Sequence, residues 1–81
     1  MEEIKETLKA YLLKEFLPGE DPKALTDTTP LITGGILDSI ATLKLVAFIE
    51  ERYGFTLRAY EADVENLNTI ADITKLILSK L

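Results

Sequence analysis

Hydrophobic residues in the N-terminal part of the chain recur at the spacing of one helix face. Between residues 2 and 17 they are Ile4, Leu8, Tyr11, Leu12 and Phe16. This spacing predicts an amphipathic helix over about 2–17, with the apolar stripe turned toward a core. Pro18 and Gly19 are expected to end it, because proline cannot continue a helix and glycine tolerates the turn that follows.

The charged residues of this first segment lie off the apolar stripe. Glu2 precedes Lys5 and Glu6 precedes Lys9 by three residues, the spacing at which opposite charges pair on a helix surface. We therefore expect these side chains to pair locally and to keep the outer face in water.

Residues 18–37 are rich in proline, glycine and threonine and show neither helical nor strand periodicity. We predict a long loop here, held to the core by Leu25, Leu31 and Ile32. A loop of about 20 residues in so small a domain is usually functional.

A second helix is predicted from Asp38 to Tyr53. Its apolar stripe is expected to comprise Ile40, Leu43, Val46, Ile49 and Tyr53, widened by Leu45, Ala47 and Phe48. Asp38 or Ser39 is placed to cap its N-terminus, and Gly54 to end it as a left-handed glycine.

The C-terminal third contains one further long helix. Residues 55–57 are too short for a strand and are predicted as an extended link, followed by a short helix over 59–64. Thr69 is expected to cap the last helix, with Asp72 in the capping-box position. The apolar stripe of that helix is expected to be Ile70, Ile73, Leu76, Ile77 and Leu81. The prediction is an all-α fold, a small four-helix bundle of three main helices and one short third helix, forming one domain over residues 1–81.

Composition narrows the function. The net charge of −5 disfavours nucleic-acid binding through phosphate neutralisation and favours partners with a basic surface. The 81 residues include no cysteine and no histidine, so the commonest general base and the commonest metal ligands are missing. We expect no metal site, no membrane span and no catalytic residue. Because no signal-like segment lies near the start, we expect a cytoplasmic protein. We also expect it to be a monomer and not an enzyme.

One constellation carries candidate chemistry. The run from Gly34 to Ile40 leads into the second helix and places the Ser39 hydroxyl at its start, directly after the carboxylate of Asp38. An aspartate and a serine before an apolar run are also an ordinary helix cap. The two glycines, Gly34 and Gly35, would let the backbone turn sharply beside the serine, or would serve simply as loop residues.

The chain resembles the acyl and peptidyl carrier proteins over nearly its whole length, as a discrete, stand-alone member of that family. Leu37-Asp38-Ser39-Ile40 is similar to the family's attachment motif, which opens the second of four helices after a long loop. The similarity extends to residues 29–31, 50–54 and 65–70.

The resemblance implies that Ser39 carries 4′-phosphopantetheine donated by coenzyme A. A phosphopantetheinyl transferase would attach it, so Ser39 needs no base within this chain. The implied further partners are a loading enzyme of the acyltransferase, adenylation or ligase type, and downstream synthase or tailoring enzymes. The cargo would be an acyl or aminoacyl thioester.

The resemblance also implies that partners recognise the exposed side of the second helix, including Asp38 and Ile40 beside the serine. Glu50 and Glu51 match acidic positions of the family, although they could be plain surface charges. Phe48 is either a core residue or, if exposed, an apolar docking residue.

Lys44 departs from the family pattern, because many fatty-acid carriers have a glutamate at this position. This departure favours a polyketide, nonribosomal peptide or related specialised pathway over fatty-acid synthesis. An alternative of another class is a helical interaction module whose serine is never modified.

Overall fold

The computed structural model of the protein describes residues 2–81, apart from the side chain of Pro22. The α-helices are α1 (Glu2–Phe16), α2 (Ser39–Tyr53), α3 (Val64–Leu67) and α4 (Ile70–Lys80), and a short 3-10 helix, η1, spans Pro22–Ala24. Within residues 2–81 there is no strand. The predicted all-α bundle of three long helices and a short third one is therefore confirmed.

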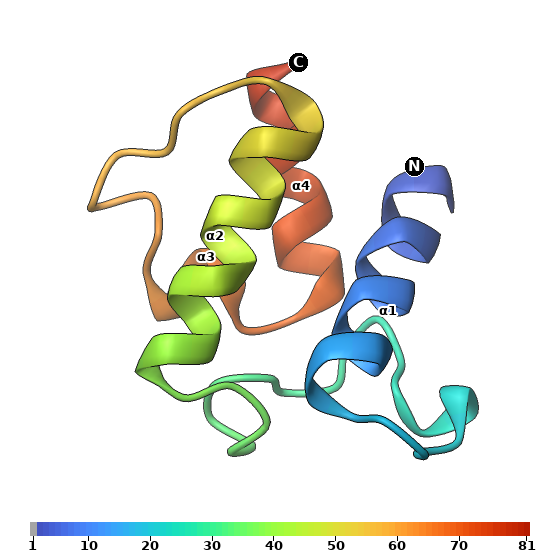
Figure 1. Cartoon of the computed structure of the whole chain (residues 1–81). Coiled ribbons are helices and arrows are strands. Elements are labelled where there is room, and N and C mark those ends of the chain that lie inside the picture. The colour runs from blue at the N-terminus through green and yellow to red at the C-terminus, as the bar shows by residue number, and fades with distance from the viewer. Residues whose placement is uncertain (1) are drawn as a thin grey trace.

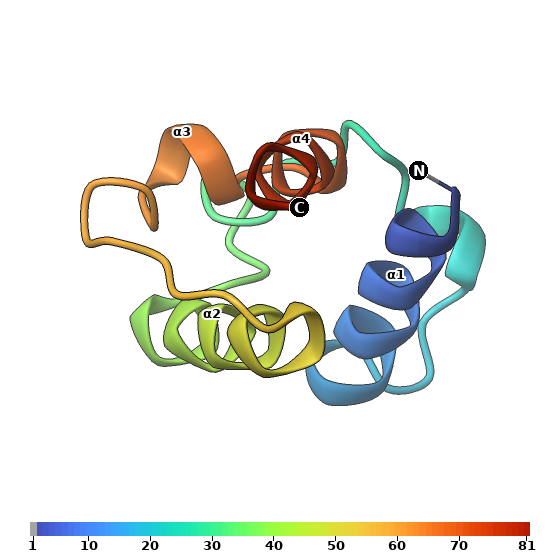
Figure 2. The same ribbon diagram turned by 90° about the horizontal axis from the view of Figure 1, so that it is seen from above.

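The three long helices stand side by side, with α1 running opposite to α2 and α4 (Figure 1). Seen from above, α2 forms one side of the molecule, α3 and α4 form the other, and α1 closes one end (Figure 2). The segment between α1 and α2 crosses beneath the bundle at the end where α2 begins. This arrangement places the start of α2 at the edge of the molecule, next to that loop.

A single hydrophobic core lies between the long helices. Its fully buried side chains are Leu8 and Leu12 of α1, Leu31 of the loop, Leu45 and Ile49 of α2, Leu67 of α3, and Ile70, Ile73 and Ile77 of α4. The predicted stripes of α1 and α4 supply most of these residues. Leu81 is an exception, because the helix ends before it and its side chain is exposed.

The buried face of α2 differs from the predicted one. Ala41, Leu45 and Ile49 face the core, whereas Ile40 and Leu43 are 66% and 69% exposed. The segment is apolar almost all the way round, so its periodicity did not identify the face that packs inward. Gly54 ends the helix in the left-handed region with φ 74°, as predicted.

The predicted position of the third helix, 59–64, is wrong. Residues 59–63 form turns, and α3 begins at Val64, where the Asp63 side chain accepts a hydrogen bond from the Asn66 amide at 3.1 Å. The cap on Asp63 therefore sets the start of the helix. In α4 the predicted cap is confirmed, since the Thr69 hydroxyl accepts from the Asp72 amide at 3.1 Å.

The loop between α1 and α2 is fixed to the bundle by buried leucines and by backbone hydrogen bonds. Leu25 and Leu31 are buried as predicted, while Ile32 is half-buried and Leu37 adds an anchor. The Ala71 amide donates to the Asp27 carbonyl at 3.0 Å, which joins the loop to the first turn of α4.

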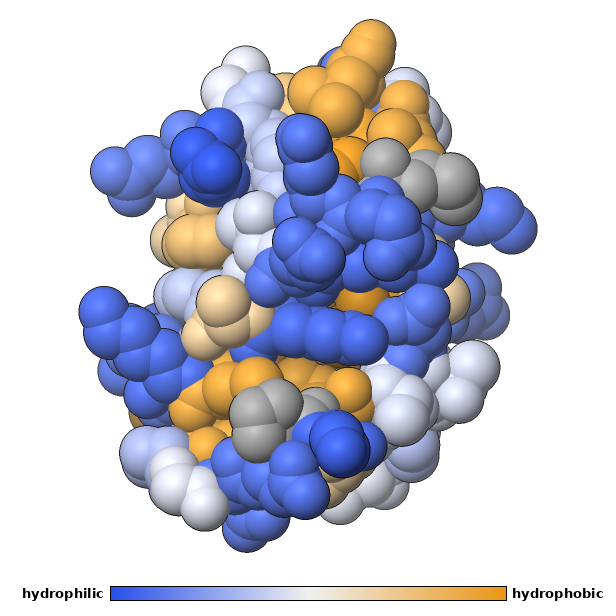
Figure 3. Space-filling view, turned by 90° about the vertical axis from the view of Figure 1, so that its right-hand side faces the viewer, coloured by the Kyte–Doolittle hydropathy of each residue, from blue (hydrophilic) through white to orange (hydrophobic). Residues whose placement is uncertain are grey.

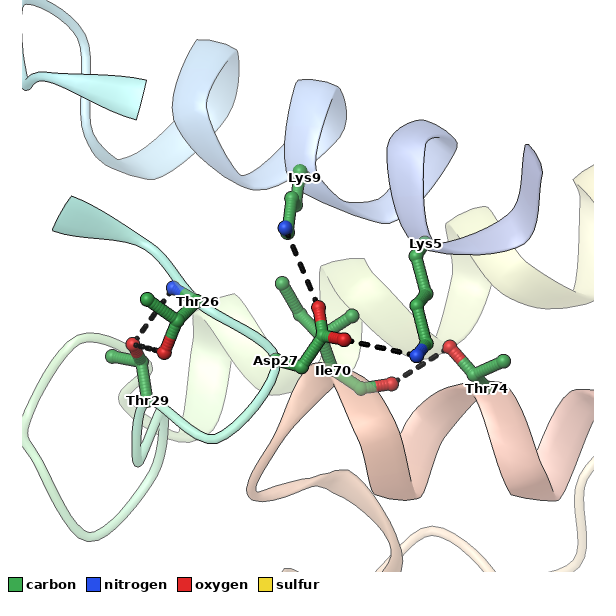
Figure 4. A network of polar contacts seen from close by, with 7 residues as sticks. All are labelled: Lys5, Lys9, Thr26, Asp27, Thr29, Ile70 and Thr74. Atoms are coloured by element: carbon green, nitrogen blue, oxygen red, sulfur yellow. Dashed lines mark hydrogen bonds and ion pairs between the residues drawn. The ribbon is translucent and has the colours of Figure 1, made fainter. Parts of the chain in front are cut away.

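The charges of α1 do not pair within the helix as the spacing suggested. Lys5 and Lys9 both reach the Asp27 carboxylate of the loop, at 2.9 Å and 3.4 Å (Figure 4). The carboxylate lies between the two ammonium groups, so one loop residue is a better partner for both than the glutamates on the helix. Nearby, the buried Thr74 hydroxyl donates to the Ile70 carbonyl at 2.8 Å.

The face of the molecule on the α1 side is covered through its middle by hydrophilic side chains, with apolar ones above and below (Figure 3). This face therefore has the hydrophilic outer surface that was predicted for the first helix. In residues 2–81, none of the helices is both long enough and apolar enough to cross a membrane.

Candidate functional site

Ser39 is the first residue of α2, and its side chain is exposed. The residue that caps the helix is Asp38, whose carboxylate accepts from the Ala41 amide at 2.7 Å. Of the two candidates for the cap, the structure therefore selects Asp38. Within residues 2–81 the Ser39 hydroxyl makes no hydrogen bond that would hold it against the protein, so it remains available at the helix end.

The first turn of α2 is held by further contacts to Asp38. The Thr42 amide and the Thr42 hydroxyl both donate to the Asp38 carbonyl, at 2.9 Å and 2.8 Å. Together with the side-chain cap, these bonds fix the backbone on both sides of Ser39. The serine hydroxyl is therefore presented on a turn that is closed by three hydrogen bonds to Asp38.

Ser39 lies on the rim of an open groove of about 540 Å³. The residues that line it are Ile32 and Leu37 of the loop, Asp38, Ser39, Thr42 and Leu43 at the start of α2, and Ala62, Asp63 and Val64 before and within α3. The groove is mainly apolar where Leu43 and Val64 border it, and acidic where Asp38 and Asp63 do. Residues 62–64 form the wall of the groove that comes from the segment before α3 and from α3 itself. Nothing in their local sequence indicates that they share a groove with the serine.

The glycine pair before the serine is required by the backbone. Gly35 has φ 82°, a left-handed conformation that favours glycine. A Cβ atom on Gly34 would lie 2.2 Å from the Pro30 carbonyl oxygen. Gly34 thus permits a close approach of two backbone segments, and Gly35 permits the turn that follows it.

Four of the predicted recognition residues are exposed near or along α2: Asp38, Ile40, Lys44 and Glu51. The apolar Leu43, which was expected on the buried stripe, joins them on this surface. Its exposure could not be read from periodicity in a helix that is apolar on several sides.

Phe48 and Glu50 are instead tied into the fold. The Phe48 ring is half-buried and stacked on Tyr11 of α1, with ring centroids 4.0 Å apart and an interplanar angle of 13°. Burial raises the pKa of the Tyr11 phenol, and the nearby Glu15 adds to the shift. The Glu50 carboxylate accepts from the Leu57 amide at 2.7 Å. Phe48 and Glu50 therefore both have structural contacts that account for their positions.

The site combines the Ser39 hydroxyl with the carboxylates of Asp38 and Asp63 on one groove. The sequence contains no histidine, and the carboxylate nearest in sequence, Asp38, is engaged by the Ala41 amide. Comparison of the sequence with protein-family models and with curated proteins gave no match.

Proposed function

We propose that the protein is a carrier that holds an acyl or aminoacyl group on a phosphopantetheine arm attached to Ser39. The observation that supports this most directly is the exposed Ser39 hydroxyl at the first position of α2, on a turn capped by Asp38. A serine buried in the bundle, or placed in mid-helix facing neighbouring side chains, would have been inaccessible to a modifying enzyme.

The attachment reaction needs only the Ser39 hydroxyl from this chain. The Ser39 oxygen would attack the phosphorus that bears pantetheine in coenzyme A. A phosphodiester bond forms, the pyrophosphate bond breaks, adenosine bisphosphate leaves, and the serine proton passes to a base on the transferase. The arm ends in a thiol, which supplies thioester chemistry when attached.

The start of α2 also suits the product. A phosphodiester there lies near the first backbone amides of α2, those of Ser39 and Ile40, and near the positive end of the helix dipole, which favour a negative group by about 0.3–1 kcal/mol. The groove that Ser39 borders is open to solvent, which supports an arm that leaves the serine along it. These features support the fit of the group to residues 37–43.

Incubation with a phosphopantetheinyl transferase and coenzyme A tests the proposal. The intact mass should rise by one phosphopantetheine, and Ser39→Ala should abolish the rise. The sequence has one other serine, Ser79, whose hydroxyl donates to the Leu76 carbonyl at 2.6 Å in α4. Ser79→Ala is the matched control and should be modified normally. No gain of mass with several transferases would contradict the proposal and favour an unmodified helical interaction module.

We further propose that the carrier serves a specialised pathway. Lys44 is exposed on α2 five residues after the serine, beside the exposed Leu43. A cation at this point would repel the basic surfaces that suit an acidic carrier. Loading assays with fatty acyl, malonyl and amino-acid donors and their loading enzymes would test this choice, and efficient loading by a fatty-acid system would contradict it.

A further inference from the structure

Asn68 occupies the single position between α3 and the Thr69 cap of α4, far in sequence from the candidate site. Its side chain is half-buried and turned toward the loop that precedes Ser39. The Asn68 side-chain oxygen accepts from the Ile32 amide at 2.9 Å and from the Thr33 amide at 3.0 Å.

The main chain of the same residue extends this contact. The Leu31 amide donates to the Asn68 carbonyl at 2.6 Å. The backbone amides of residues 31, 32 and 33 therefore all donate hydrogen bonds to Asn68. The side-chain amide of Asn68 also lies 3.2 Å from the Thr33 hydroxyl. Asn68 thus holds residues 31–33 in place through both its side chain and its main chain.

Backbone hydrogen bonds also join residues 31–33 to the residues that lead to Ser39. The Leu37 amide donates to the Leu31 carbonyl at 2.8 Å, and the Gly35 amide donates to the Ile32 carbonyl at 3.1 Å. Leu31 and Leu37 are both buried. Residues 31–37 therefore form a closed loop. Its two ends are joined by the bond from Leu37 to Leu31, both leucines lie in the core, and the Leu31 end is bonded to Asn68.

Asp38 and Ser39 follow this closed loop without an intervening residue. A displacement of residues 31–33 would move Leu37 through its bond to Leu31, and with it the cap and the serine. We infer that Asn68 is a positioning residue that holds the Ser39 hydroxyl in place relative to α3 and the groove. The functional part of this inference rests on the proposed modification of Ser39.

The role requires an oxygen acceptor at position 68, which determines the choice of variants. Asn68→Ala leaves the Ile32 and Thr33 amides without their acceptor. Asn68→Asp keeps an oxygen acceptor for both amides, but it replaces the side-chain donor with a second acceptor oxygen and adds a negative charge. If acceptor geometry is what matters, the alanine variant should be impaired and the aspartate variant should resemble the wild type.

The first measurement is amide hydrogen exchange, which does not depend on any function. Asn68→Ala should accelerate exchange at Ile32 and Thr33 by about fivefold to tenfold, the loss expected for one ordinary hydrogen bond. Core amides of α4 should change less. Asn68→Asp should restore slow exchange at both amides.

The second measurement is the rate of phosphopantetheine transfer to Ser39. A misplaced nucleophile should lower kcat/KM by about tenfold or more in Asn68→Ala, with recovery in Asn68→Asp. Ile73→Val controls for general loss of stability. Ile73 is fully buried in α4, and its aliphatic side chain can form no hydrogen bond with the loop. If Asn68→Ala does not fold, Asn68→Ser, with a shorter acceptor, takes its place.

The outcomes separate the two ideas. Unchanged exchange at Ile32 and Thr33, a normal transfer rate in the alanine variant, or a loss no larger than that of Ile73→Val would each overturn the positioning role. A wild-type chain that gains no mass would instead contradict the proposed function.

Discussion

The Glu50 carboxylate accepts a hydrogen bond from the Leu57 amide at 2.7 Å, which joins the last turn of α2 to the extended segment after it. Leu57 is buried, so its amide would be left without an acceptor if the carboxylate were removed. We expect Glu50→Ala to lower the free energy of unfolding by about 1–3 kcal/mol. Urea unfolding followed by circular dichroism measures this loss.

The neighbouring Glu51 provides the control, since it is exposed on the same helix. Glu51→Ala removes the same charge and should change the free energy of unfolding by less than about 0.5 kcal/mol. Equal losses in the two variants would show that the contact to Leu57 contributes nothing.

The ion pairs of Asp27 make stability depend on pH. The hydrogen bond from Lys5 lowers the pKa of Asp27, and Lys9 lowers it further. A carboxyl whose pKa is lower in the folded state stabilises the fold above its ordinary pKa of about 4, and this contribution is lost as the pH falls through the folded-state value. Asp27→Asn should therefore lower the melting temperature at pH 7, and the difference should shrink in acid.

Melting curves of the wild type, Asp27→Asn and Glu51→Gln between neutral and acidic pH provide the comparison. Glu51→Gln removes the same charge from an exposed position and should have little effect at any pH. A difference between wild type and Asp27→Asn that stays constant down to the lowest pH would contradict the role of the ion pairs. High salt should also reduce the difference at pH 7, because the pairs are partly exposed.

The long helices were predictable because they depend on local order. The 3.6-residue period, the glycine after Tyr53 and the threonine before Ile70 each act within a few residues, and the structure bears them out. The third helix was misplaced because it is only four residues long, and a single cap on Asp63 outweighs any periodicity at that length.

What the sequence could not predict depends on residues far apart in the chain. The pairing of Lys5 and Lys9 with Asp27, and the contact of Asn68 with residues 32 and 33, arise only after the loop has packed against the bundle. For the candidate site, the serine and its cap followed from local sequence. The groove wall formed by residues 62–64 and the exposure of Leu43 did not, because they depend on which face of α2 meets the core.

Gly34 allows a close backbone contact that no other residue permits. Because a Cβ atom there would lie 2.2 Å from the Pro30 carbonyl oxygen, Gly34→Ala must displace the loop that leads to Ser39. We expect a loss of about 1–3 kcal/mol in stability and a slower transfer of phosphopantetheine. Gly19→Ala is the control, since Gly19 has φ 87° but no atom within 4 Å of the added Cβ. It should cost stability without slowing the transfer, and an equal slowing in both variants would exclude a specific role for Gly34.

Asp38 combines a helix cap with a charge beside the serine, and two substitutions separate these roles. Asp38→Ala should destabilise the protein by about 1 kcal/mol, because the Ala41 amide loses its acceptor. Asp38→Asn should keep the stability, since asparagine caps helices as well as aspartate does. If the transferase recognises the charge, kcat/KM for modification should fall in the asparagine variant while its unfolding curve is unchanged. A normal kcat/KM in Asp38→Asn would reduce the residue to a cap.

Lys44 tests which kind of partner the carrier meets. Its side chain is exposed, so Lys44→Glu should leave the unfolding curve unchanged. If the partners of the proposed specialised pathway place neutral or acidic groups opposite Lys44, the substitution should slow association with the cognate loading enzyme several-fold, and less so at high salt. Lys75→Glu makes the same change in net charge at an exposed position of α4 and should have little effect. Faster association of the Lys44→Glu variant would instead indicate a basic partner surface, as expected for a fatty-acid carrier, and would contradict the proposed pathway.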